Sequence, residues 1–177
     1  MPLTSDAGEK MSKNTGAEKN DVLYEYLKTL GACYASGIFE PLFPLLSDDV
    51  VQESVWVVTP NTGREAVTRY FARKGETFRQ HNCCPQFKIV QLGGNVHFLD
   101  TDKVHVNGEK AKPARIGLWY PDGKLCLLLW QTISGTTNSM IIDLTLDEEE
   151  KICRIDFCGP ELYEFIPYER TDDNVLE

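Results

Sequence analysis

Apolar residues recur at helical spacing near the start of the chain. From Asn20 or Asp21, either of which can cap a helix, they follow one another every three or four positions as far as Tyr34. Gly37 then ends the pattern. A short second helix is expected around Pro41, because proline is tolerated in a first helical turn. The sequence therefore predicts two successive helices, each with one apolar side.

The pattern then changes to a strand and back to a helix. Residues 49–58 are rich in β-branched side chains and predict one strand, which a turn at residues 60–63 closes. Thr62 and Glu65 stand in the capping-box pattern, so a third helix is expected to begin there. A solvated face is the simpler interpretation of this helix's basic side, and contact with a phosphate or an acidic partner is the alternative. The basic residues are Arg64, Arg69, Arg73, Lys74 and Arg79.

The chain after Pro85 has the pattern of strands and turns. The clearest predicted hairpin joins residues 114–120 to residues 124–133 around Pro121-Asp122-Gly123. The other expected elements are a strand at residues 87–92, a small hairpin within 95–106 that turns at 100–102, a turn at Asn107-Gly108, and a last hairpin of residues 139–146 and 152–158 around the acidic turn 147–150. Helices followed by antiparallel strands indicate an α+β protein.

Residues 125–130 (LCLLLW) are apolar at every position. A strand of this kind is buried on both faces of its sheet. The helices of the same chain are expected to cover one face. Another subunit is a candidate cover for the other face.

Length and charge limit the classes of protein to which this chain can belong. The 177 residues suit a flexible arm at 1–19, a single domain at 20–169 and a flexible acidic tail at 170–177. Residues 143–177 carry 12 acidic and 3 basic residues within a net charge of −9, so no nucleic-acid partner is expected. No apolar run approaches the ~20 residues of a membrane span, and the first residues lack the apolar core of a signal peptide. A cytoplasmic location without membrane contact is therefore expected.

The six cysteines do not indicate a metal or redox site. None belongs to a Cys-x-x-Cys pair, which argues against a zinc knuckle and against a thioredoxin-like motif. The sequence accordingly predicts no cofactor.

Two segments carry a resemblance to a known superfamily. They are residues 37–71 (GIFEPLFPLLSDDVVQESVWVVTPNTGREAVTRYF) and residues 141–157 (IIDLTLDEEEKICRIDF). The first resembles the nuclear-transport-factor-2-like superfamily, in its SnoaL-like and ketosteroid-isomerase-like branch: a short helix ending in Leu-x-Asp-Asp, a strand, a proline-containing turn and a third helix. The second is similar to the last two strands of that superfamily with their acidic turn.

The resemblance implies a cystatin-like cone, in which a curved antiparallel sheet wraps on the N-terminal helices and leaves a pocket at its mouth. It also implies a homodimer through the outer sheet face. The compact isomerases have far fewer residues than 81–113 between the third helix and the following hairpin. This insert is a candidate lid, sheet extension or partner-binding segment.

The resemblance also locates the positions that catalyse ketosteroid isomerisation, a reaction that needs a carboxylate base and a two-donor oxyanion hole. In this sequence the base position holds Ser54, the late-strand acid position holds Ile142, and the tyrosine position falls near Leu30. A serine without a basic partner does not take a proton from carbon near neutral pH. These residues argue against that activity. Glu53, turned inward by a bulge, and Tyr34, at the mouth, are the alternative catalytic candidates.

The same comparison names positions that face the pocket, and their apolar and aromatic character is typical of small-molecule sites. They are Gln52, Ser54, Trp56, Val58, Met140, Ile142, Leu144, Ile155 and Phe157. The alternative is that these side chains simply fill the cone as core.

Two histidines are candidates for a metal site. His97 and His105 stand four residues on either side of Thr101, so in a hairpin centred there they would face each other and bind a metal with Asp100 or Asp102. Exposed strand histidines are the favoured interpretation, and no metal site is predicted.

The sequence thus predicts a protein that binds a small apolar molecule and has no assignable catalytic centre. An isomerase, dehydratase or cyclase with a non-standard acid or base is one alternative. A protein-interaction module that uses the basic third helix or the insert is the other.

Overall fold

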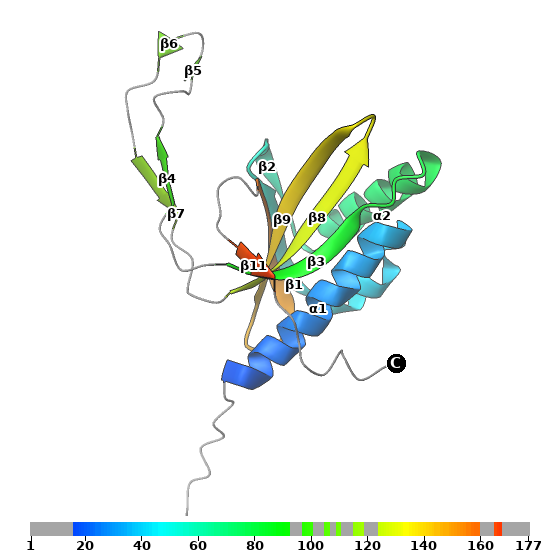
Figure 1. Cartoon of the computed structure of the whole chain (residues 1–177). Helices are drawn as coiled ribbons and strands as arrows, with labels where there is room; N and C mark the ends of the chain where they lie inside the picture. Colours follow the sequence, from blue (N-terminus) through cyan, green and yellow to red (C-terminus); the bar gives the residue numbers. More distant parts are fainter. Residues whose placement is uncertain are drawn as a thin grey trace, which may run out of the picture.

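The computed structural model describes residues 16–92, 97–100, 105–106, 109–110, 115–118, 124–159 and 165–167 (Figure 1). Three helical segments lie in this part of the chain: α1 (Gly16–Ser36), the 3-10 helix η1 (Glu40–Leu45) and α2 (Arg64–Gln80). All three were expected, with small differences in their ends.

The start of α1 corrects the predicted flexible arm. Residues 16–19 belong to the helix, because Ala17, Glu18 and Lys19 are good helix formers that extend it beyond the predicted caps. The rest of the arm, 1–15, and the predicted tail, 170–177, lie outside the described residues. Gly37 ends α1 as predicted, with a φ of 71° that favours glycine.

Seven strands form one sheet that curves around the helices (Figure 1). Its order is β11, β3, β8, β9, β10, β1 and β2. The strands are β1 (Leu46–Ser54), β2 (Val57–Thr62), β3 (Gln86–Leu92), β8 (Leu125–Ile133), β9 (Thr136–Leu146), β10 (Ile152–Cys158) and β11 (Phe165–Pro167). Every neighbouring pair is antiparallel except β1 and β10, which run parallel. The α+β class is confirmed, and the expectation of a purely antiparallel sheet is corrected at this pair.

The predicted strand at 49–58 is in fact a hairpin. β1 ends at Ser54, which pairs with Val57, so that Trp56 lies in the connecting turn rather than in a strand. β2 continues to Thr62, which pairs with Val51, and Gly63 caps α2 without a side-chain hydrogen bond. The predicted capping box does not form because Thr62 is held in the sheet one residue before the cap.

The predicted hairpin of residues 114–120 and 124–133 does not form either. β8 pairs with β3 on one side and with β9 on the other. Ser134 and Gly135, with φ of 52° and 81°, make the two-residue turn into β9. An apolar strand buries more surface between two partners than at the end of a hairpin, which explains why β8 is central.

Two small ladders replace the predicted hairpin within 95–106. β4 (His97–Asp100) pairs with β7 (Arg115–Leu118), and β5 (His105–Val106) pairs with β6 (Glu109–Lys110). The ladder of β5 and β6 flanks the predicted turn Asn107-Gly108, which itself lies outside the described residues.

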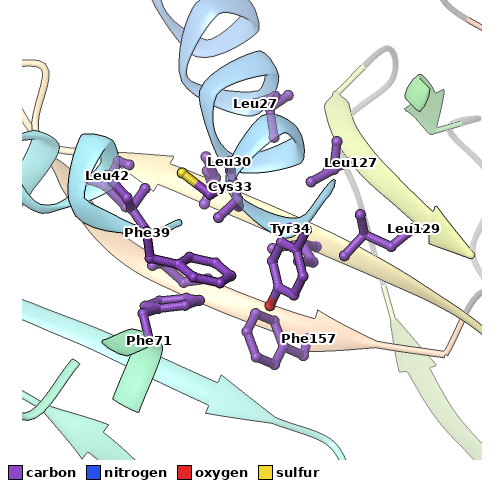
Figure 2. Close-up of a cluster of buried hydrophobic side chains, with 14 of the residues drawn as sticks. Leu27, Leu30, Cys33, Tyr34, Phe39, Leu42, Phe71, Leu127, Leu129 and Phe157 are labelled. Atoms are coloured by element: carbon purple, nitrogen blue, oxygen red, sulfur yellow. The ribbon is translucent and has the colours of Figure 1, made fainter. Parts of the chain in front are cut away.

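The core lies between the helices and the inner face of the sheet. Figure 2 shows this cluster, with Leu27 and Leu30 of α1 and with Leu127 and Leu129 of β8. The alternate residues of β8 point to the outer face, where Cys126 lies in a second buried cluster with Val90, Ile141 and Cys158. Leu128 and Trp130 on the same face are only half-buried, so the predicted burial of β8 is complete on the inner face and partial on the outer face.

Candidate functional site

A cavity of about 160 Å³ opens at the mouth of the curved sheet. Its wall on the sheet is formed by Leu129 and Met140, which lie opposite each other on β8 and β9. Gln131 and Asn138, the next inward-facing pair, give it a polar rim. The complete lining is Tyr34, Lys74, Phe78, Pro85, Leu129, Trp130, Gln131, Asn138, Ser139 and Met140.

A second hollow of about 500 Å³ runs along the exposed side of α2. We call it the basic recess. Its lining is Asn61, Ala66, Arg69, Tyr70, Arg73, Lys74, Thr77 and Phe78. The cavity and the basic recess share Lys74 and Phe78, so the two hollows meet at these side chains.

Lys74 lies at this junction, surrounded by aromatic rings. Its Nζ is 5.5 Å from the ring centroid of Tyr34, 5.4 Å from those of Tyr70 and Phe157, and 5.8 Å from that of Phe78. It also donates a hydrogen bond of 3.1 Å to Tyr70 Oη. Burial lowers the pKa of Lys74, whereas ring faces favour the ammonium form.

Tyr34 provides a buried hydroxyl beside Lys74. The ring extends from α1 toward Phe71 and Phe157 in Figure 2, and its Oη has no hydrogen-bond partner in the described part of the chain. Burial raises the pKa of Tyr34 well above its usual value, and it raises the pKa of Tyr70 to about 12. Both tyrosines are therefore protonated at neutral pH, so their hydroxyls are available to donate a hydrogen bond to a ligand and are not bases.

Comparison with known proteins identifies the fold. Neither a protein-family model nor a curated protein matches the sequence. Among solved structures, a nuclear-transport-factor-2-like (NTF2-like) protein from Anabaena variabilis matches with a TM-score of 0.51 and 13% identity, covering 84% of this chain and 94% of that one. A protein with a cystatin-like fold from Silicibacter pomeroyi matches with a TM-score of 0.46 and 14% identity, covering 81% and 74%.

This chain has the NTF2-like fold. None of the helices in the described part of the chain combines the length and apolar character that a membrane span needs.

Several of the predicted pocket residues lie on the inner face of this NTF2-like sheet. Met140 lines the cavity, and so does Tyr34, which was a catalytic candidate rather than a predicted pocket residue. Phe157 packs against Lys74, as described above. The others on this face are buried side chains that do not line the cavity, namely Ile142, Leu144, Ile155 and Gln52. Gln52 accepts a 2.7 Å hydrogen bond from Asn61 Nδ2.

The expectation for Trp56 and Val58 is wrong. Trp56 is 58% exposed and Val58 is fully exposed, and neither lines the cavity. The reason is the turn after Ser54, which sends the chain back along the sheet edge as β2. Ser54 itself is half-buried and its hydroxyl accepts a hydrogen bond from the backbone of Trp56, away from the cavity lining.

Glu53 does not occupy the position of a catalytic base. The pairing of β1 and β2 is irregular between Gln52 and Ser54, as the bulge hypothesis required. Glu53 nevertheless pairs with Asp156 on the outer face and forms an ion pair with Arg154. The positions that matched an oxyanion hole, Leu30 and Ile142, are fully buried apolar side chains.

The histidine hypothesis is also corrected. His97 pairs with Leu118 and His105 pairs with Lys110, so the two histidines do not face each other across a hairpin. Within the described residues, no group of three histidine, cysteine, aspartate or glutamate side chains is placed to hold a metal ion.

Sequence reasoning missed the position of Lys74 in the site. The pattern placed this lysine on a solvated basic side, whereas the structure buries much of it beneath aromatic rings. A signal was present: Tyr70 and Phe78 stand four residues before and after Lys74, and residues at that spacing share one helix face.

Proposed function

We propose that this protein binds a small, mainly apolar molecule in the cavity at the mouth of the cone. The observation that carries the proposal is a hollow of about 160 Å³ between Tyr34, Phe78, Leu129 and Met140 that the side chains of the described residues leave open. An apolar cavity of about 150 Å³ accommodates a six-membered aromatic ring.

The lining supports binding without proton transfer by a carboxylate. Among the described residues, no aspartate or glutamate lines the cavity. Glu53, the base considered from the sequence, is held by Arg154 on the outer face, and Tyr34 is a donor. We therefore favour a binding protein of the SnoaL-like branch, located in the cytoplasm, over an isomerase.

The test is titration with the uncharged fluorophore N-phenyl-1-naphthylamine. We expect saturable enhancement of its fluorescence with the wild-type protein. Met140→Trp, which fills the cavity from its wall, is expected to weaken binding at least tenfold, because the ring then has no space. Thr145→Trp adds the same bulk at an exposed position of β9 and is expected to leave binding unchanged. Equal binding by both variants would place the fluorophore elsewhere.

We further propose that the protein is a homodimer through the outer face of the sheet. The support is the apolar character of that face, where Leu128 packs beside the buried cluster that contains Cys126 and Ile141. The cluster itself is buried within the chain, whereas Leu128 is only half-buried and remains able to contact a partner.

A further inference from the structure

We propose that the ligand is an amphipathic anion, whose apolar part occupies the cavity while its acidic oxyanion group, such as a carboxylate, lies against Lys74 and Arg73 in the basic recess. This inference rests on the proposed function, because the apolar part uses the same cavity. It adds a charged group to the ligand and a second subsite to the protein.

The geometry joins the two subsites. Lys74 and Phe78 line both the cavity and the basic recess, so one molecule can contact both without crossing packed core. The cavity is bordered mainly by apolar and aromatic side chains. The basic recess is lined by Arg69, Arg73 and Lys74, and no aspartate or glutamate of the described chain lines it.

The basic residues of α2 indicate an anionic partner that the described residues do not supply. Three of its five basic residues are engaged within the fold. Arg64 pairs with Asp48, Arg69 pairs with Glu65, and Arg79 donates to the carbonyl oxygen of Gly37.

Arg73 and Lys74 differ from those three residues. Neither forms an ion pair with any described residue, and both line the basic recess. They are therefore the two cations on this helix that remain available to a ligand, in a protein whose net charge is −9.

The surroundings of Lys74 also favour an anionic ligand. A partly buried ammonium without a counter-ion is unfavourable, and its aromatic neighbours compensate only in part. Its one hydrogen-bond acceptor among the described residues is Tyr70 Oη, which leaves two N–H donors for a ligand oxygen. Because Tyr70 accepts from Lys74, the proton of its own hydroxyl is free to donate to the same oxyanion.

Two fluorophores that differ by one sulfonate provide the test. 8-Anilinonaphthalene-1-sulfonate is N-phenyl-1-naphthylamine with an added oxyanion, so the ratio of their dissociation constants isolates the charged subsite. We expect the wild-type protein to bind the sulfonate at least tenfold more tightly, and we expect added sodium chloride to reduce that ratio.

Variants test whether the preference for the sulfonate depends on Lys74 and Arg73. In Lys74→Met, which keeps an unbranched side chain without charge, the ratio is expected to fall toward one. In Arg73→Gln, at an exposed position, we expect a fall of about threefold. Lys88→Met changes net charge equally at an exposed position of β3 and is expected to leave the wild-type ratio unchanged.

The possible results separate this inference from the proposed function. If the uncharged fluorophore does not bind, the proposed function fails. If it binds but the sulfonate binds no better, or if the preference survives in both Lys74→Met and Arg73→Gln, the anion subsite is overturned while the cavity remains a binding site. Because Arg73 is exposed, its variant tests the subsite even where Lys74→Met does not fold.

Discussion

At the scale of single residues, Lys74 is expected to lower the stability of the fold and to contribute to binding of the proposed ligand. Burial disfavours its ammonium form, and no carboxylate among the described residues compensates. Residues that serve a site at the expense of stability are common in binding proteins. The free protein is therefore expected to be less stable than a variant that lacks this charge.

Lys74→Met tests that expectation. At pH 7 the variant should be more stable by about 1 kcal/mol in urea unfolding. The pKa of Lys74 is lower in the folded state than in the unfolded state, so between these two values the unfolded chain binds more protons. Wild-type stability should therefore rise relative to the variant as pH increases through that interval, and the difference should vanish above about 10.5.

A less stable Lys74→Met variant would contradict this expectation. A loss of stability in Lys74→Met at pH 7 would show that the four ring contacts outweigh the desolvation of the ammonium. Lys88→Met, exposed on β3, is the control for the general effect of removing one positive charge.

At the scale of elements, Gly37, which directly follows α1, packs against Gly75 of α2. A Cβ added at Gly75 would lie 2.5 Å from the carbonyl oxygen of Gly37 and 3.0 Å from the ring of Phe39. The first of these neighbours is backbone at the end of α1 and cannot rotate away. The close contact positions Tyr34, three residues before Gly37, beside the cavity.

Gly75→Ala should therefore destabilise the protein by about 1–3 kcal/mol, measured by urea unfolding. Helix propensity alone would give the opposite sign, a gain of about 1 kcal/mol. Ala72→Gly, at an exposed position of the same helix, is the control and should cost about 1 kcal/mol through propensity. A stabilising Gly75→Ala would show that the helices have room to separate.

The helices and the last hairpin could be predicted from the sequence, because their signals lie within short segments. The apolar spacing up to Tyr34, the glycine at Gly37 and the acidic turn before Ile152 act locally. Strand pairing is decided between distant segments, and there the predictions failed. Nothing in residues 114–133 shows that β8 prefers β3 and β9 to its neighbour β7.

At the scale of the whole molecule, the mouth of the cone was partly predictable. Met140 was assigned to the pocket and Tyr34 to the mouth as a catalytic candidate, and both line the cavity. Trp56 was assigned to it by extending the strand alternation two residues too far, past the turn that follows Ser54. Lys74 was not assigned because its burial depends on rings from α1 and β10, which only the folded chain brings together.

The proposed homodimer is a prediction at this scale. Size-exclusion chromatography with light scattering should give twice the chain mass of 20.0 kDa. Leu128→Lys, on the outer face, should shift the protein toward the monomer, because a charge would then be desolvated in the interface. Gln80→Lys, exposed at the end of α2, should remain dimeric. A wild-type mass of one chain would exclude this assembly.

The position of β2 at the edge of the sheet, within the described part of the chain, has a further consequence. β2 forms one end of the seven-stranded order, and its valines Val57 and Val58 are exposed there. A strand from another molecule can pair with such an edge, and many β proteins aggregate in this way. Pro60 lies within β2 and offers no N–H to an incoming strand. Pro60 therefore interrupts the row of backbone N–H donors with which an incoming strand would pair. We expect it to limit aggregation through this exposed apolar edge at high protein concentration.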